Sequence, residues 1–148
     1  MTIVLSGDDL ARTVSNLVRD AVAAVGQHEV WVKASSLLEV AHGLRNDPGL
    51  DFALLSSVTA VDYIDHFEVI YHITSISHNR AAIMKVRCGQ GRIDPVVPSV
   101  VEVWQGADYQ EREVWDLMGV KFEGHPNHKR IMLWDGFPGH PLRKDYLR

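Results

Sequence analysis

Three consecutive apolar stretches, joined by short polar links, limit the possible fold more than any other feature of this sequence. Residues 52–63 are rich in Leu, Val and Thr, and apolar residues alternate with more polar ones over 67–73 and again over 81–88. An alternation of period two places every second side chain on the same face of a strand. Because the links at 62–66 and 77–80 are short enough for hairpins, we predict an antiparallel meander with one apolar face.

Two amphipathic segments and a short strand precede this meander. Apolar residues recur every three or four positions from Ser6 to about Val25, which predicts one long helix. A strand is expected over 29–33, and Ser36 with Glu39 has the spacing of a capping box at the start of a second helix. Two helices covering a small antiparallel sheet define an α+β fold, which differs from the βαβ units of nucleotide-binding proteins.

Short helices are expected after residue 90. Ser99 and Glu102 repeat the capping pattern and predict a short helix there. A further helix is expected over 108–118, ended by Gly119 in the left-handed conformation that commonly closes helices.

The C-terminal part of the chain has a different composition. Residues 121–148 hold six basic and three acidic side chains, whereas residues 1–120 hold nine basic and sixteen acidic ones. Gly, Pro and aromatic residues are frequent in this part, without a helical or strand period. We therefore predict an α+β domain over 1–90, a loop with short helices over 91–120, and an extended partner-binding segment over 121–148, called the C-terminal arm below.

Composition excludes several functional classes. With 15 Lys and Arg against 19 Asp and Glu, the chain lacks the positive excess typical of nucleic-acid binding. Cys88 is the only cysteine, so this chain alone forms no disulfide, Cys-only zinc site or iron–sulfur cluster. No apolar run approaches the roughly 20 residues of a membrane span. We expect membrane association only through partners.

Motifs for catalysis are also missing. Gly89-Gln90-Gly91 lacks the third glycine of a dinucleotide loop, because Asp94 stands in its place and Pro95 follows. There is no Gly-x-Ser-x-Gly elbow, and Cys88 lies on the predicted core face of its strand, where cysteine acts as a small apolar residue. We therefore expect neither catalytic nor cofactor-binding residues in this chain.

One group of histidines leaves a metal site open as an alternative. His125, His128 and His140 are the candidate ligands, and imidazole with carboxylate would suit zinc or iron. The surrounding Gly and Pro prevent a regular helix from aligning the three rings, and their spacing matches no closed structural site. Hydrogen bonding in an ordered loop is the simpler role, with a stand-alone metalloenzyme as the alternative. The nearby carboxylates are Glu123, Asp135 and Asp145.

Charged and aromatic residues are densest over 111–116, which favours an interaction module. Arg112 and Asp116 have the four-residue spacing of a surface ion pair on a helix. Trp115 lies among these charges, and a large aromatic residue next to Arg and acidic groups is typical of a protein-interface anchor. Charge and an aromatic residue coincide again over 143–146.

These residues resemble the signature of the 30 kDa subunit family of respiratory complex I, the proton-pumping NADH:quinone oxidoreductase. The signature asks for Glu-Arg-Glu, then an acidic and two apolar residues, then His or Lys, a basic residue and two more apolar ones. The chain supplies all of these, and residues 139–146 also resemble the closing motif of the family. The matching residues are Glu111, Arg112, Glu113, Asp116, Leu117, Met118, His125, Lys129, Ile131 and Met132.

The resemblance implies a non-catalytic scaffold subunit in the peripheral arm of complex I, where electrons pass from NADH to quinone and protons are translocated. It implies no cofactor in this chain, with flavin and iron–sulfur clusters in partner subunits, and packing on the 49 kDa subunit. In a bacterium the protein would lie at the cytoplasmic face of the cell membrane. An equivalent subunit of a related membrane-bound hydrogenase, or of a quinone reductase with another donor, is the alternative. The expected partner contacts are Glu111, Arg112, Glu113, Trp115, Asp116, His125, Trp134, His140, Arg143, Lys144, Asp145 and Tyr146.

Overall fold

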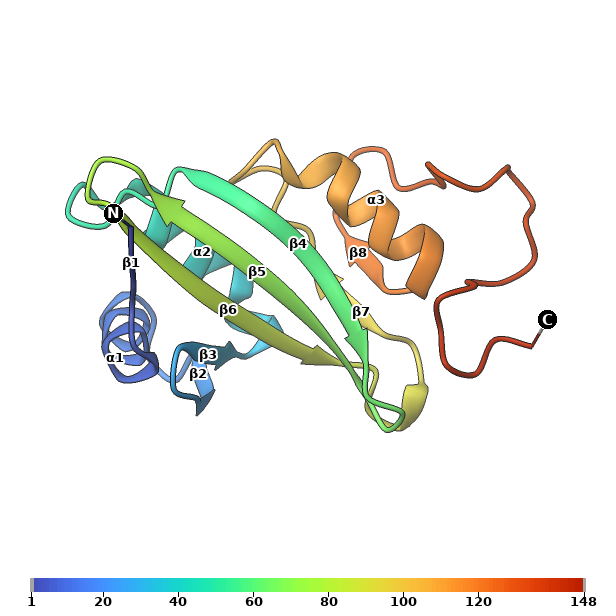
Figure 1. The fold of residues 1–148 in the computed structure, drawn as a ribbon, viewed down its shortest axis with the longest axis horizontal. Coiled ribbons are helices and arrows are strands. Elements are labelled where there is room, and N and C mark those ends of the chain that lie inside the picture. Colours follow the sequence, from blue (N-terminus) through green and yellow to red (C-terminus); the bar gives the residue numbers. More distant parts are fainter. Residues whose placement is uncertain (1, 148) are drawn as a thin grey trace.

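A twisted antiparallel meander forms the centre of the structure, a computed structural model that describes residues 2–147 (Figure 1). Its strands are β4 (Leu54–Asp62), β5 (Phe67–Ser75) and β6 (Arg80–Cys88). The inward side chains of β5 and β6, such as Tyr71 and Met84, are fully buried. The meander predicted from the period-two pattern is thus confirmed.

The sheet is larger than predicted and contains parallel as well as antiparallel pairs. Its order is β2-β3-β6-β5-β4, and the short β1 (Ile3–Val4) also pairs with β6. β2 (Val22–Val25) and β3 (Glu29–Val32) are antiparallel to each other, whereas β1 and β3 both run parallel to β6. The meander therefore gains three strands on its β6 edge.

The long helix expected from Ser6 to Val25 is wrong in its second half. Helix α1 spans Gly7–Leu17, and a turn with Asp20 in the left-handed region then leads into β2. The apolar residues of 21–25 fit a helical and a strand period equally well. β-branched valines favour strands, and pairing with β3 satisfies the backbone of this segment.

Both capping predictions fail, although one of the two helices is present. Helix α2 spans Leu37–Asn46 and follows a 3₁₀ turn, η1 (Ala34–Ser36), so that Ser36 has nearly helical dihedrals and no side-chain cap bond. Residues 101–103 form a turn instead of the predicted helix. There the Ser99 hydroxyl donates to Glu111, and Glu102 contacts His42.

The remaining elements join the C-terminal half to the same core. A second 3₁₀ turn, η2 (Gln90–Arg92), leads to β7 (Val96–Pro98), which pairs in parallel with β8 (Lys121–Glu123). Between them lies α3 (Ala107–Met118), which ends at Gly119 in the predicted left-handed conformation, with φ 76°. Val97, Val100, Val120 and Phe122 belong to the core formed by the sheet and α2.

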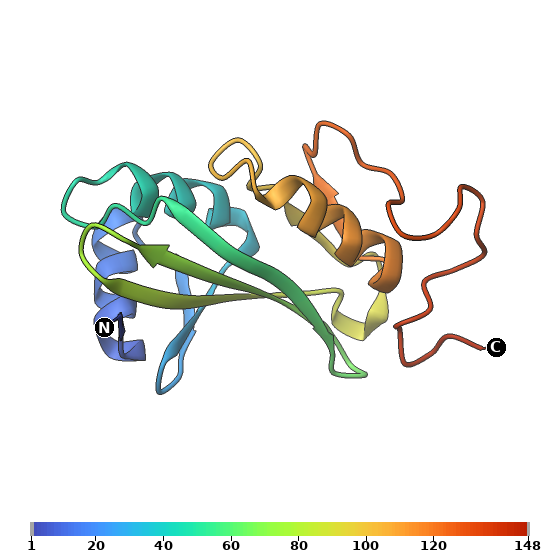
Figure 2. The ribbon, with the colours of Figure 1, turned by 45° about the horizontal axis from the view of Figure 1, so that its top comes forward.

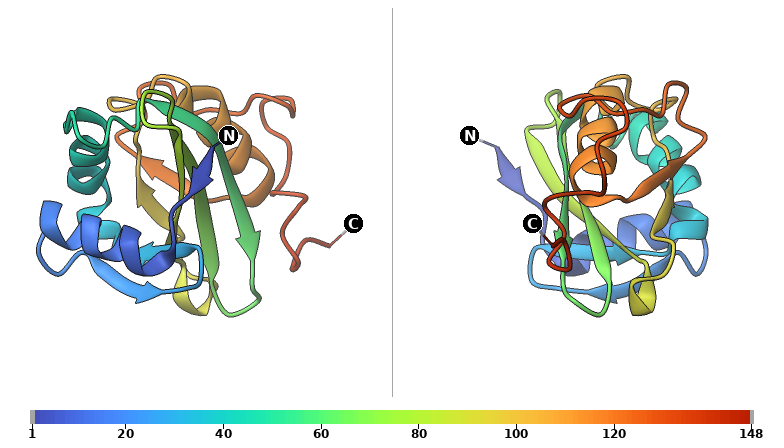
Figure 3. Two further views of the ribbon diagram at one scale, coloured as in Figure 1. Left: turned by 60° about the vertical axis from the view of Figure 1, so that its left-hand side comes forward. Right: turned by 90° about the vertical axis from the view of Figure 1, so that its right-hand side faces the viewer.

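All three helices lie on the same side of the sheet (Figures 1 and 3). The arm leaves β8 and passes the end of α3 (Figure 2), and residues 124–147 form turns and bends there. Within the described part of the chain, no helix is long and apolar enough to cross a membrane.

Candidate protein-interaction site

The C-terminal end of α3 is capped by the arm. The last four carbonyls of a helix lack partners inside the helix and need donors from elsewhere. The Asp116 carbonyl accepts hydrogen bonds from Arg130 Nη1 at 3.1 Å and from His140 Nδ1 at 3.0 Å, and the Leu117 carbonyl accepts one from the Leu142 amide at 2.8 Å. The arm thus supplies donors that the helix itself cannot provide.

The carboxylate of Asp116 holds a second set of donors from the arm. It is fully buried, and its Oδ1 accepts a hydrogen bond from Arg130 Nη1 at 2.8 Å. Its Oδ2 accepts from the amides of Ile131, Met132 and Leu133 at 3.2, 2.8 and 2.9 Å. Burial alone would raise the pKa of Asp116, but these hydrogen bonds hold it below its usual value. The group is therefore an ionised carboxylate in a closed ring of donors.

Arg130 is the cation of this site, and the sequence reasoning missed it. Besides Asp116, its Nη2 donates to the carbonyls of Phe137 at 2.7 Å and Gly139 at 2.8 Å. Its guanidinium also lies over the Phe137 ring. One side chain therefore joins α3 to two further turns of the arm. The only sequence signal was the need of a buried acid for a cation, and burial of Asp116 was itself not predicted.

The predicted surface pair of Arg112 and Asp116 is wrong for the same reason. Asp116 points into the arm and is used by Arg130. Arg112 instead donates to the carbonyls of Lys129 at 3.2 Å and Arg130 at 3.0 Å. Both side chains bind the arm, so this face of α3 is an intramolecular contact.

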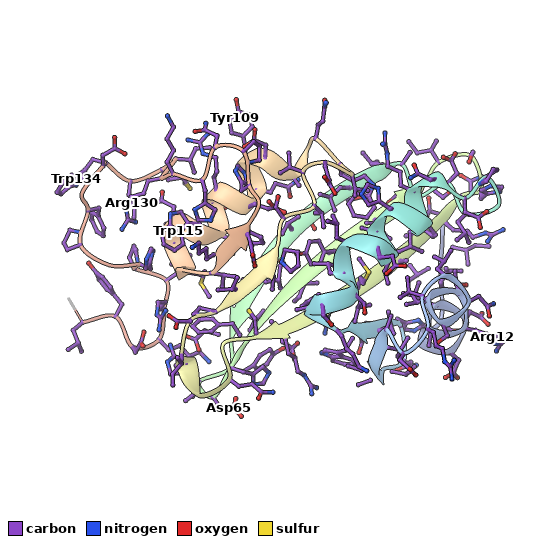
Figure 4. All side chains as sticks on the ribbon, turned by 180° about the vertical axis from the view of Figure 1, so that it is seen from behind. Arg12, Asp65, Tyr109, Trp115, Arg130 and Trp134 are labelled. Atoms are coloured by element: carbon purple, nitrogen blue, oxygen red, sulfur yellow. The ribbon has the colours of Figure 1, made fainter. Side chains whose placement is uncertain are left out.

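Trp115 lies between two histidine rings of the arm (Figure 4). The centroids of His128 and His140 are each 4.8 Å from the Trp115 ring, at interplanar angles of 54° and 56°. Gly119 makes room for this arrangement, because a Cβ there would lie 2.8 Å from the His140 ring and its φ of 76° is unfavourable for other residues. The half-buried Trp115 therefore anchors this chain's own arm.

The three histidines of the metal alternative use ring nitrogens for backbone contacts. His128 Nε2 accepts from the Phe122 amide at 3.0 Å, and burial, together with the neighbouring His125, lowers the pKa of His128. His125 Nε2 donates to the Asp108 carbonyl at 3.1 Å, and His140 bonds the end of α3. Within residues 2–147 no three His, Cys, Asp or Glu side chains are placed to hold a metal ion. The rings therefore order the loop.

The far end of the arm is fixed to the hairpin between β4 and β5. Asp62, at the end of β4, accepts from both terminal nitrogens of Arg92 at 2.6 and 2.8 Å and from the Lys144 amide at 2.9 Å. Arg92 and Arg143 both donate to Asp145. Hydrogen bonds from Arg92 hold the pKa of Asp62 well below its usual value. Residues 143–145 thus form a second anchor, remote from Asp116.

Glu111 faces the core, away from the arm. It is fully buried, its Oε1 accepts from the Ser99 hydroxyl at 2.6 Å, and its Oε2 accepts from the Val100 amide at 2.9 Å. Burial raises the pKa of Glu111 to about 7, with these two hydrogen bonds acting in the opposite direction. Its neighbour Glu113 is exposed, so the two acids lie on different sides of α3 as predicted.

The outer side of the arm carries apolar side chains. Trp134 is 65% exposed and Met132 64%, although the backbone of Met132 is tied to Asp116. Figure 4 shows Trp134 at the outer edge of the arm, whereas Trp115 lies against α3. Leu142 is also exposed, and Tyr146 is half-buried. The arm therefore binds α3 on one side and presents anchors for a partner on the other.

An α+β domain whose C-terminal segment is fixed to its last helix and displays large apolar side chains is typical of an accessory subunit in a protein assembly. Residues 30–148 match the family described as "Respiratory-chain NADH dehydrogenase, 30 Kd subunit". The chain belongs to this family, which confirms the resemblance found in its signature residues.

Curated relatives agree with this assignment, and each of them is named as a subunit of an NADH-quinone oxidoreductase. The relative from Rhizobium meliloti is 38% identical over 132 residues, covering 87% of this chain and 71% of that protein. The relative from Cupriavidus pinatubonensis is 37% identical over 146 residues, with 93% and 73% covered. The relative from Saccharopolyspora erythraea is 42% identical over 125 residues, covering 82% of this chain but 49% of that protein. The chain thus spans between about half and three quarters of these relatives.

Solved structures share the fold. The trypsin-resistant fragment of Nqo5 superposes with a TM-score of 0.61 at 26% identity, covering 80% of this chain and 98% of the fragment. A chain of the archaeal membrane-bound sulfane sulfur reductase, a respiratory membrane complex, superposes with a TM-score of 0.75 at 24% identity, covering 95% and 85%. At that identity the second likeness shows the fold alone.

Replacing Asp116 by Asn should release the arm from α3. The amide is neutral and brings its own donor into a ring of donors, so we expect a loss of about 2–4 kcal/mol of stability and rapid proteolysis within 124–147. Denaturant unfolding and limited proteolysis measure the two effects. Glu113→Gln removes an exposed charge from the same helix and is the control, expected to behave as wild type. Equal protease resistance of Asp116→Asn and wild type would contradict this role of the carboxylate.

Glu111 should make stability depend on pH. Because the pKa of a folded-state carboxyl near 7 exceeds its unfolded value, the folded state binds the proton more tightly, and stability falls as pH rises from 5 to 8. Glu111→Gln mimics the protonated form, with an oxygen for Val100 and an amide donor for Ser99. We expect this variant to gain, relative to wild type, on the order of 3 kcal/mol between pH 5 and pH 8 in urea unfolding. A pH-independent difference would show that Glu111 does not titrate in this range.

Proposed function

We propose that this chain is a non-catalytic scaffold subunit of the peripheral arm of an NADH-quinone oxidoreductase, in which it supports electron transfer from NADH to quinone coupled to proton translocation. Membership of the 30 kDa family and the relatives named as NADH-quinone oxidoreductase subunits support this assignment. In this proposal flavin and iron–sulfur clusters belong to partner subunits. The protein associates with the membrane peripherally, at its cytoplasmic face in a bacterium, through those partners.

The partner that we propose for the arm is the 49 kDa subunit. The observation that carries this proposal is the two-sided arm: hydrogen bonds to Asp116 and Asp62 fix its backbone, while Trp134 and Met132 point outward. An interface anchor contributes most when its backbone is ordered before binding, because less conformational entropy is then lost. Most of the other expected contact residues, such as Trp115 and Arg143, act by holding the arm in this shape.

The division of the chain into 1–90, 91–120 and 121–148 stays a proposal, which the contacts refine at one boundary. Phe122 is buried in the core and β8 pairs with β7, so residues 121–123 belong structurally to the domain. The partner-binding part of the arm accordingly lies beyond Glu123.

The fold alone does not distinguish an NADH-linked complex from one that uses another electron donor. A chain of the archaeal sulfane sulfur reductase has the same fold at 24% identity. Relatives at 37–38% identity over most of this chain, by contrast, are named as parts of NADH-quinone oxidoreductases. This closer relationship favours the NADH-linked assignment, and purification of the native complex together with an NADH-oxidising flavin subunit tests it.

A double substitution of Met132 and Trp134 by Ala should prevent stable incorporation into the complex. Both side chains are mostly exposed, so the isolated chain should keep its melting temperature, while loss of two anchors should lower incorporation about tenfold or more. Affinity purification of the tagged chain from its own cells, with quantification of the 49 kDa subunit, measures this effect. Ile3→Ala, 66% exposed at the opposite end of the molecule, is the control. Full incorporation of the double variant would contradict the proposed interface.

A further inference from the structure

Two loops meet at the end of the sheet where β4 turns into β5. The hairpin tip, residues 63–66, lies beside the loop that contains η2 (Figure 1). The Gly91 amide donates to the Asp65 carbonyl at 2.7 Å, and Arg92 Nη1 donates to the Ile64 carbonyl at 2.8 Å. The two loops therefore form one unit, and Figure 4 shows Asp65 at its outer edge.

This unit is strained at residues other than glycine. Ile64 has φ 76°, and in the neighbouring loop Arg92 has φ 68° and Asp94 has φ 42°. The left-handed region is unfavourable for a β-branched side chain, and turns that require it usually contain Gly or Asn. A strained residue persists only where its surroundings impose it.

Hydrogen bonds on both sides of the Ile64 backbone impose this conformation. The Ile64 amide donates to Asp62 Oδ1 at 2.8 Å, and its carbonyl accepts from Arg92, which is itself held by both carboxylate oxygens of Asp62. Since Asp62 also binds the Lys144 amide, the hairpin tip is connected to the second anchor of the arm. The position of Ile64 is thus rigid and fixed relative to the arm.

The strained conformation serves no contact within the described part of the chain. The Ile64 side chain is 65% exposed, and Ile93 on the adjoining loop is 72% exposed. Two exposed isoleucines on a rigid, strained support match the general observation that strain is retained at binding sites. Their acidic neighbours Asp65 and Asp94 are exposed as well, and Asp65 contacts His66 at 2.7 Å.

We propose that Ile64 and Ile93 form a preformed docking knob that inserts into an apolar pocket of a neighbouring protein subunit, with basic residues at the rim of that pocket. The flanking carboxylates favour a cationic rim and disfavour an anionic lipid surface, which would repel them. A rigid knob loses little conformational freedom on binding. The inference rests on the proposed function, in that the chain works inside an assembly, and adds a contact separate from Met132 and Trp134.

Replacement of Ile64 by Asn tests the knob, because Asn tolerates the left-handed conformation and lacks the apolar side chain. For the isolated variant we expect a melting temperature equal to that of wild type or roughly 3 °C higher, from relief of strain. In cells, the fraction of the tagged chain recovered in the complex should fall about fivefold or more, and Ile93→Asn should act in the same direction. Ile76→Asn, 70% exposed in the turn at the other end of β5, is the matched control and should assemble normally.

A photo-crosslinking residue at position 64 in the assembled complex identifies what the knob contacts. An adduct with another protein subunit supports the proposal. An adduct with lipid, no adduct, or wild-type assembly of Ile64→Asn overturns it. These outcomes are distinct from failure of the proposed function, in which the wild-type chain itself would not copurify with the complex.

Discussion

The buried contact between Asp116 and Arg130 is the interaction on which the C-terminal part of this structure depends. An ionised carboxylate without water is stable only when hydrogen-bond donors replace its hydration, and here one guanidinium and three consecutive amides do so. Because all four donors come from residues 130–133, the carboxylate determines the path of the arm as well as its attachment. Arg130 then extends this order to Phe137 and Gly139.

Folding of the arm onto α3 explains why a segment without helix or strand can act as an interface. Two anchors, at Asp116 and Asp62, fix its beginning and its end, and between them Trp134 faces outward. The chain therefore loses the entropy of ordering the arm when it folds, before it meets a partner. Both anchors use buried acids, which links the interface to the integrity of the domain.

The sequence predicts those parts of the molecule whose order is local. The strand period over 52–88, the helix over 108–118 and its end at Gly119 are all visible as patterns, and the signature residues identify the family. Val22–Val25 could not be assigned correctly, because its apolar spacing fits both periods and pairing with β3 decides between them. Contacts between distant loops, such as Asp62 with Lys144, have no period at all and could not be predicted.

The central claim is that Asp116 orders the arm in the chain itself, without a partner. Hydrogen exchange of the isolated protein tests it at the amides of Ile131, Met132 and Leu133. The account predicts that these amides exchange about 100-fold more slowly than in an unstructured peptide, because each is bonded to a buried carboxylate. Exchange at the rate of an unstructured peptide in the wild-type chain would contradict it and would mean that a partner has to order the arm.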